Sequence, residues 1–544
     1  MDTVQHIWNR LWKWNDQVKE VFRFFSGVNN QISKHAEATD EKSSSTPHNE
    51  KPPAYTNRQW IGLVLGPLLF LVTMLWISPE GMSSEAQAVL ACTLWISTWW
   101  ITEAIPIPAT SLLPIVLFPL TGALEIGEAT SSYGDPTIFL FMGGFMIALT
   151  MEKWNLHKRI ALTIISWVGT QPSRLLLGSM IATGFLSMWI SNTATAMMMV
   201  PIGMAITAHV AASLKDNQSV DTTPGKFPFG TAMMLGIAYS ASIGGLGTLI
   251  GTPPNAIFAA QVKKIFGVEI SFASWMLVGV PLVILLLGVA WFYLVKIAYP
   301  TPIKDLPGGK AIIQKEKSAL GSTTSEEKAV FTVFVLTALA WITRDLVLKN
   351  FIPGIDDTII AIGAAVILFL IPARNHPGTF ILDWNTAKNL PWGILLLFGG
   401  GLAIAAGITG SGLDKWIGQQ LIMLEGTNFI LILLLVTTLV IFLTEITSNT
   451  ATATMMFPIM ASFAAALGVH PYPLMVAAGL AASCAFMLPV ATPPNAVVFG
   501  SGSVRIDDMA RTGFWLNLLS ILVITMVVYF LLPTVWGIDL MKPM

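Results

Sequence analysis

The sequence predicts an all-α polytopic membrane protein built from two inverted repeats, and three observations point to this fold class. Hydrophobic residues make up 54% of the 544 residues and charged residues only 11%, with a mean hydropathy of +0.67, which excludes a water-soluble globule of this length. The apolar residues form many segments of about 20, the length of a membrane-spanning helix. The third observation is a duplication, because FLSMWISNTATAMMMVPI around Ser191 returns as FLTEITSNTATATMMFPI around Ser448.

Each copy of this duplicated segment is an apolar run with a polar triplet at its middle. Serine and asparagine are poor residues inside a helix but good N-caps, so each triplet marks a point where one half-helix ends and another begins. We therefore expect two re-entrant hairpins, over residues 173–211 and 428–468. Their tips are Ser191, Asn192 and Thr193 in the first half, and Ser448, Asn449 and Thr450 in the second.

A second duplicated word follows each hairpin, GTPPNAIF from Gly251 and ATPPNAVVF from Ala491. Two adjacent prolines remove two backbone donors and disfavour a helical residue just before them, so each word predicts a broken span. Irregular backbone at membrane depth is tolerated only where it is buried in protein or lines a cavity. Paired discontinuous helices in corresponding halves therefore indicate the binding site of a transporter.

The chain divides into five parts on composition. We expect an amphipathic interfacial helix over 1–35, a polar linker over 36–59, a first transmembrane half over 60–299, a cytoplasmic linker over 300–328 and a second transmembrane half over 329–535. About 11 spans and the two hairpins follow, with one span predicted over 104–124. A cytoplasmic amino terminus puts most of the 30 Lys and Arg residues on the cytoplasmic side. The two hairpins then enter from opposite faces, which makes the repeats inverted.

Four further residues invite a chemical interpretation. Cys92 and Cys484 lie in apolar segments of different halves, so they are interpreted as small buried hydrophobic residues and not as a disulfide or metal pair. Glu445 lies inside an apolar run, where an acid is a functional candidate by default, and we favour an orienting or packing role for it. Glu103 stands at a junction between spans and is interpreted as a solvated or backbone-bonded acid.

The paired SNT tips, the paired TPPN breaks, the order of the spans and the phrase FMGGFMIALTMEKWNLHKRIAL from Phe141 together resemble the divalent anion/sodium symporter family. The resemblance covers about residues 60–535. It implies sodium-coupled uptake of C4-dicarboxylates such as succinate, malate and fumarate, at a cell membrane. It also implies an elevator-type mechanism, a homodimer and two or more bound sodium ions, with the hairpins and broken spans moving against the remaining helices.

The resemblance also assigns candidate residues to each ligand. The first sodium site would use Ser187, Ser191, Asn192 and the Gly251 carbonyl, and the second would use Thr444, Thr447, Ser448, Asn449 and the Ala491 carbonyl. The substrate would contact Asn192, Thr193, Asn449, Thr450, Thr252 and Thr492. The alternative interpretation is that these polar residues only cap broken helices.

Chemistry supports such sites independently of the family, because no Lys or Arg stands in the middle of any predicted span. Neutral donors and the amino-terminal ends of half-helices must then bind a dianion. Removing two carboxylates from water is costly, and co-bound cations would offset that cost. Coupling between cation and anion follows from this argument.

Other functions stay open from the sequence. A sodium-independent exchanger of 2-oxoglutarate, malate or succinate, or a carrier of citrate or sulfate, would keep the tips and change a few side chains. A membrane-embedded enzyme would need a nucleophile or metal motif, and the sequence contains no HExxH or GxSxG; a pump would need GxxxxGK[ST], which is also absent. The net charge of -1 gives no indication of a nucleic-acid partner.

Overall fold

The computed structural model describes residues 55–77, 79–169, 171–214, 221–223, 225–300, 309–421 and 428–544. Across these residues the fold is helical, and pairing between extended segments is limited to one bridge from Pro372 to Phe380. Eight of the described helices are long and apolar enough to cross a membrane. The predicted all-α membrane fold is confirmed. The expected interfacial helix over 1–35 and nearly all of the linker over 36–59 lie outside the described residues.

The first half of the chain runs from α3 to η3. Ser, Thr or Asp side chains cap the starts of α3, α4, α8, α11 and α14, as at α8, where Asp135 accepts a hydrogen bond from the backbone of Thr137. The bounds are α3 (Asn57–Trp76), α4 (Ser84–Thr102), α5 (Ile107–Thr110), α6 (Leu113–Thr121), α7 (Ile126–Ser131), η2 (Ser132–Gly134), α8 (Pro136–Lys153), α9 (Leu156–Val168), α10 (Pro172–Ser187), α11 (Asn192–Ser213), α12 (Pro228–Gly245), α13 (Pro253–Phe266), α14 (Phe272–Phe292) and η3 (Tyr293–Ala298).

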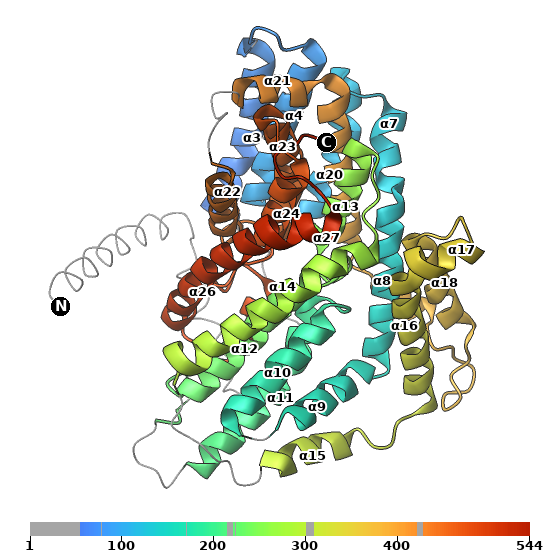
Figure 1. The fold of residues 1–544 in the computed structure, drawn as a ribbon, viewed down its shortest axis with the longest axis vertical. Helices are drawn as coiled ribbons and strands as arrows, with labels where there is room; N and C mark the ends of the chain where they lie inside the picture. Colours follow the sequence, from blue (N-terminus) through green and yellow to red (C-terminus); the bar gives the residue numbers. More distant parts are fainter. Residues whose placement is uncertain are drawn as a thin grey trace, which may run out of the picture.

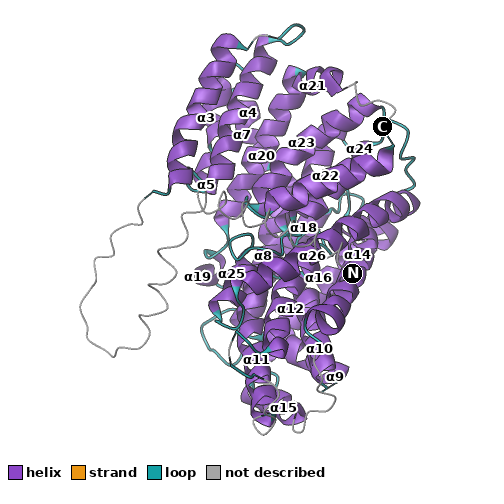
Figure 2. Ribbon diagram, turned by 90° about the vertical axis from the view of Figure 1, so that its left-hand side faces the viewer, coloured by secondary structure: helices purple, strands orange, loops and turns teal. Residues whose placement is uncertain are grey.

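The second half repeats this order after a connecting helix. Its bounds are α15 (Gly309–Ala319), α16 (Ser325–Thr343), η4 (Arg344–Leu348), α17 (Lys349–Phe351), α18 (Asp357–Leu370), α19 (Trp384–Ala387), α20 (Trp392–Ser411), α21 (Leu413–Leu421), α22 (Phe429–Thr444), α23 (Asn449–Leu467), α24 (Pro471–Ala482), α25 (Pro493–Gly500), α26 (Ile506–Met526), η6 (Val527–Leu531) and α27 (Leu532–Trp536). In Figures 1 and 2, α15 and α21 lie at opposite ends of the molecule.

Two details differ from the sequence-based expectation. The single span predicted over 104–124 is wrong, because the structure has two short helices there, α5 and α6. The reason is Pro114 in the first turn of α6, which has no backbone N–H to continue the helix before it. The segment 300–328, interpreted as a linker, contains the helix α15.

The two repeats pack on one another in the same way. In each, the first arm of the hairpin lies against the first part of the broken span, α10 on α12 and α22 on α24. The helix that follows each TPPN word then packs against the second arm of the other repeat's hairpin, α13 on α23 and α25 on α11. This exchange gathers both hairpins and both broken spans into one unit, which we call the hairpin unit.

Glycines allow helices outside the hairpin unit to approach it closely. A Cβ added at Gly144 of α8 would lie 3.2 Å from Ile250 Cγ2, just before the first TPPN word, and one added at Gly401 of α20 would lie 2.2 Å from Thr454 Cγ2 on α23. Gln261 of α13 donates from Nε2 to the Gly401 carbonyl at 3.1 Å. Thus α8 and α20 each touch the hairpin unit through a glycine.

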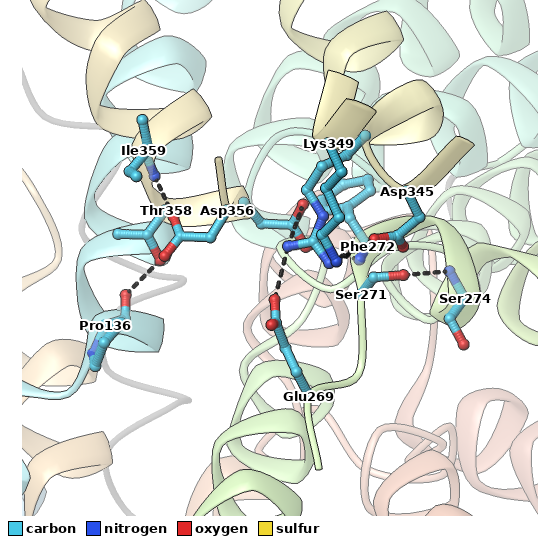
Figure 3. A network of polar contacts seen from close by, with 12 residues as sticks. Pro136, Glu269, Ser271, Phe272, Ser274, Asp345, Lys349, Asp356, Thr358 and Ile359 are labelled. Atoms are coloured by element: carbon cyan, nitrogen blue, oxygen red, sulfur yellow. Dashed lines mark hydrogen bonds and ion pairs between the residues drawn. The ribbon is translucent and has the colours of Figure 1, made fainter. Parts of the chain in front are cut away.

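A buried arginine network also joins the hairpin unit to its surroundings (Figure 3). The Arg344 side chain is 2% exposed, and its Nη1 lies 2.6 Å from Glu269 Oε1 and 3.3 Å from Asp357 Oδ1. Glu269 lies on the turn between α13 and α14, whereas Arg344 and Asp357 belong to η4 and α18. Asp357 also accepts a hydrogen bond from the backbone of Phe272, at 2.8 Å. Buried charges are stable only when paired and hydrogen-bonded; Arg344 is paired with three carboxylates, those of Glu269, Asp345 and Asp357, while its Nε has no hydrogen-bond partner.

Candidate functional site

The first hairpin turns between α10 and α11, and its tip is fixed by hydrogen bonds that it donates to the adjacent broken span. Ser191 is the N-cap of α11 and accepts from the backbone N–H of Ala194 at 3.2 Å. Ser187, which is fully buried, donates from Oγ to the Ala241 carbonyl of α12 at 2.5 Å. The Asn192 amide, oriented so that its NH₂ group faces acceptors, donates to the carbonyls of Ala241 at 3.1 Å and Gly251 at 3.3 Å. The sequence-predicted residues Ser187, Asn192 and Gly251 therefore meet.

The second tip reproduces this arrangement with a threonine. The Thr444 hydroxyl is fully buried, and its Oγ1 lies 2.7 Å from Asn449 Oδ1 and 2.8 Å from the Ala482 carbonyl oxygen of α24. Thr447 donates back into its own hairpin, to the Leu443 carbonyl at 2.8 Å. Hydroxyl, asparagine and broken-span carbonyl thus recur in the second half.

The remaining predicted residues flank these contacts. Thr252 and Thr492 stand at the N-caps of α13 and α25 and are 3% and 4% exposed; Thr492 Oγ1 accepts from the backbone of Asn495 at 3.3 Å. Ser448 is the N-cap position of α23 but its side chain makes no capping bond. The residues at the two tips are half-buried, and they are Ser191, Asn192, Thr193, Ser448, Asn449 and Thr450.

Glu445 has the orienting role that the sequence indicated. Its carboxylate accepts from the backbone N–H groups of Phe486 at 2.7 Å, Met487 at 3.0 Å and Leu488 at 3.3 Å, and from Asn517 Nδ2 at 2.7 Å. Four donors satisfy a carboxylate that is only 3% exposed. This side chain therefore holds the non-helical segment between α24 and α25 in place.

Sequence reasoning missed three asparagines that shape the site. Asn255 and Asn495 belong to the duplicated TPPN words, so the repeat itself was a signal that could have drawn attention to them. Asn517 lies on α26, far along the chain from Glu445, and no sequence pattern links the two. The interpretation of Cys92 and Cys484 is confirmed, since both are free and buried. Glu103 is exposed at the end of α4, as expected.

The tips offer two kinds of binding chemistry. Hydroxyl, amide and backbone carbonyl oxygens around Ser187, Asn192 and Gly251 resemble the unwound carbonyls that coordinate sodium in transporters. The amino-terminal ends of α11 and α23, 22 and 19 residues long, present unpaired N–H groups and a positive dipole end that favour an anion. Among the residues described by the structure, no group of three or more His, Cys, Asp or Glu side chains could hold a metal ion.

Comparison with solved structures supports the fold. The YdaH transporter of Alcanivorax borkumensis matches with a TM-score of 0.53 and 14% identity, covering 82% of this chain and 98% of that one. MtrF of Neisseria gonorrhoeae, described as illuminating a class of antimetabolite efflux pumps, matches with a TM-score of 0.50 and 12% identity over 88% of this chain and 96% of its own. At these identities the likeness concerns the fold alone.

Sequence relatives are much closer. The sodium-dependent dicarboxylate transporter SdcS of Staphylococcus saprophyticus is 54% identical over 494 residues, 90% of this chain and 95% of that protein. The protein of the same name in Staphylococcus aureus is 52% identical over 498 residues, 91% of this chain and 95% of its own. Residues 57–541 match the family described as the sodium:sulfate symporter transmembrane region. The resemblance to the divalent anion/sodium symporters is confirmed, and the chain belongs to the sodium:sulfate symporter family.

Proposed function

We propose that this protein is a sodium-coupled secondary transporter that takes up C4-dicarboxylates such as succinate, malate and fumarate across the cell membrane. The observation that carries the proposal is the duplicated tip, in which a hydroxyl, an asparagine and a broken-span carbonyl meet twice. Relatives at 52–54% identity bear the name of sodium-dependent dicarboxylate transporters, which supports the same assignment here. An enzyme activity is not part of this proposal.

In the proposed site, two sodium ions would bind beside the tips and the dianion between them. The first ion would contact Ser187, Ser191, Asn192 and the Gly251 carbonyl, and the second would contact Thr444, Thr447, Ser448, Asn449 and the Ala491 carbonyl. The substrate carboxylates would then meet Asn192, Thr193, Asn449 and Thr450, with Thr252 and Thr492 at the margins. Because a dianion is costly to desolvate among neutral donors, bound cations lower the cost of placing it there, which couples the two fluxes.

Transport by this site would proceed by an elevator movement of the hairpin unit. Helices α14 and α26 pack against the hairpin unit and would travel with it, whereas α8, α16, α18 and α20 would form the stationary scaffold. We further propose a cytoplasmic amino terminus and a homodimer. With this orientation the first hairpin enters from the cytoplasm and the second from outside, so the two tips are reached from opposite sides.

A reversible disulfide tests the elevator. A Cβ at Gly144 would lie 3.5 Å from Ile250 Cβ, within the usual range for disulfide-bonded cysteines, and the two residues lie on opposite sides of the proposed moving boundary. In Gly144→Cys/Ile250→Cys, oxidation should stop succinate uptake and a reductant should restore it. Each single cysteine variant, treated with the same oxidant, is the control. Full uptake by the cross-linked protein would exclude the movement.

The function itself is tested by labelled succinate uptake into liposomes that contain the purified protein. An inward sodium gradient should drive uptake into empty vesicles, and potassium should not replace sodium. Uptake that ignores sodium but requires dicarboxylate inside the vesicle would instead assign a sodium-independent exchanger of 2-oxoglutarate, malate or succinate. Competition by citrate or sulfate in the same assay checks the other carriers of this architecture.

A further inference from the structure

The asparagine of each TPPN word is buried in the first turn of α13 or α25, next to the loop that carries a carbonyl of the proposed sodium site. Asn255 and Asn495 are both 0% exposed. Asn255 donates from Nδ2 to the carbonyls of Gly245 at 3.0 Å, Leu246 at 3.3 Å and Thr248 at 2.8 Å. The side chain thus fastens three carbonyls of one turn to the start of α13.

The second repeat contains the same clamp at the same spacing. Asn495 donates from Nδ2 to the carbonyls of Ala485 at 3.1 Å and Leu488 at 3.0 Å. These acceptors stand ten and seven residues before the asparagine, as Gly245 and Thr248 do in the first repeat. The loops themselves differ, because α12 runs to Gly245 whereas α24 stops at Ala482. Both repeats therefore have this asparagine clamp, although the loops that it holds differ in conformation.

The hydrogen bonds of the first loop separate its carbonyls into two groups. The Leu246 carbonyl also accepts from Trp275 Nε1 at 3.0 Å, and the Thr248 carbonyl also accepts from the backbone of Gly251 at 3.4 Å. The Gly251 carbonyl instead accepts from the Asn192 amide of the hairpin tip at 3.3 Å, so this carbonyl of the loop is directed toward the tip. In the second loop, the Leu488 carbonyl likewise accepts from the backbone of Ala491, at 3.2 Å.

We propose that Asn255 and Asn495 are positioning residues for the two sodium ions. This rests on the proposed sodium-coupled function. Each amide holds upstream carbonyls of its loop and so fixes the turn that carries the Gly251 or Ala491 carbonyl to its place beside the hairpin tip. Neither asparagine touches the ion or the substrate. Without the clamp the loop relaxes, the carbonyl leaves its place, and sodium binds more weakly while the tip that receives the dicarboxylate is unchanged.

The test is the sodium dependence of succinate uptake by the full-length protein in liposomes, with potassium replacing sodium to keep ionic strength constant. Asn255→Ala should raise the half-saturating sodium concentration about tenfold, since an unmade buried hydrogen bond has an effect of this order. The KM for succinate measured at saturating sodium should stay within about twofold of the wild-type value. Asn495→Ala should behave in the same way, because Asn495 donates to the two carbonyls at the equivalent spacing.

Gln261→Ala is the matched control. Gln261 is also an amide on α13 that is 0% exposed, but it donates to Gly401 outside the loop. Its removal should leave the half-saturating sodium concentration unchanged even if the rate falls. An equal rise in Gln261→Ala, or unaltered sodium dependence in both asparagine variants, would overturn the positioning role. Sodium-independent uptake by the wild-type protein would instead overturn the proposed function, and the wild-type curve alone shows this.

A second measurement covers variants too unstable for transport. Sodium that binds the folded protein raises the Tm in a concentration-dependent way, so thermal unfolding in detergent reports binding without transport. Asn255→Ser, which keeps a shorter donor, should show the same sodium-dependent rise in Tm as the wild type but at severalfold higher sodium concentration. A Tm response at the wild-type sodium concentration would contradict the proposal.

Discussion

The two hairpin tips hold equivalent side chains, and a glycine of the following helix packs against the loop that faces each tip, but the second loop has a carboxylate clamp in addition. A Cβ at Gly279 would lie 2.7 Å from the Leu246 carbonyl oxygen, and one at Gly513 would lie 2.1 Å from the Phe486 carbonyl oxygen. In the first half α12 also packs closely on the hairpin, since a Cβ at Gly244 would lie 2.2 Å from the Gly184 carbonyl oxygen. In the second half the corresponding helix ends early, and the Glu445 carboxylate binds three successive backbone N–H groups.

This difference shows which part of each repeat is needed for function. The charge-assisted clamp is an additional way to fix the loop, since the loop with it and the loop built on Met188 both lead to a hydroxyl, an asparagine and a carbonyl at the tip. Met188 and Glu445 occupy equivalent positions in the duplicated segments, and their divergence does not alter the tip.

Removing the carboxylate clamp should have the largest effect. Glu445→Ala leaves three backbone N–H groups and the Asn517 amide without an acceptor in a buried site, at about 1–3 kcal/mol for each group. We expect little folded protein, measured by size-exclusion chromatography and thermal unfolding in detergent. Glu445→Gln keeps an amide oxygen as acceptor and should be recovered in larger amount. A Glu445→Ala protein with the wild-type Tm would show that the clamp is dispensable.

A substitution that fills the close contact between α12 and α10 should also destabilise the first half, but by less. In Gly244→Ala the new methyl group meets backbone atoms of Gly184, which cannot rotate away, and overpacking of this kind costs about 1–3 kcal/mol. The Tm should fall accordingly. Gly288→Ala on α14, where a Cβ would meet nothing within 4 Å, is the control and should not lower it. Equal Tm values for the two variants would contradict the packing argument.

A fixed negative charge at either tip should impair uptake far more than folding. Asn192→Asp and Asn449→Asp each place a carboxylate beside the proposed dianion site, and we expect succinate uptake to fall about tenfold or more through charge repulsion. Similar losses in both variants would support equivalent tips. If folded protein and uptake decline in parallel, the asparagines act only as structural caps.

The smallest effect on stability and uptake is expected at the position where one repeat has serine and the other has threonine. Thr444 makes the contacts that Ser187 makes in the first half, so Thr444→Ser should cost only the loss of one methyl group, about 1 kcal/mol. Thr444→Val keeps the shape but removes the hydroxyl, and should weaken sodium-dependent uptake much more. Equal uptake by the two variants would show that the hydroxyl is not a ligand.

The sequence was informative where structure follows from local chemistry and repetition. The polar triplet predicted where α10 ends and where α11 begins. Because the segment is duplicated, Thr444 was expected to make the same contacts as Ser187. The Glu445 partners were not predictable, because Asn517 reaches it from α26 and no periodicity links these positions. The division of 104–124 into α5 and α6 was missed because its prolines lie within an otherwise apolar run.

Some features depend on tertiary packing that no local pattern encodes. Helices α14, α16 and α26 continue through the π-helical turns η3, η4 and η6, and insertions of this kind have no simple sequence signature. The turn η4 begins at Arg344, whose partners come from α18 and from the loop after α13. The sequence does not indicate these partners, because Glu269 and Asp357 lie on other elements of the chain.

The arginine network affects the expected rate of transport. If the hairpin unit moves as proposed, the turn that carries Glu269 must leave Arg344, which keeps Asp345 and Asp357, and the vacated side of a guanidinium that is 2% exposed must find water or a new partner midway. The charged groups would then be hydrated near the top of the barrier, where hydration of ions becomes less favourable as temperature rises. The crossing rate of this carrier would therefore depend on ion hydration as well as on the fit of its helices.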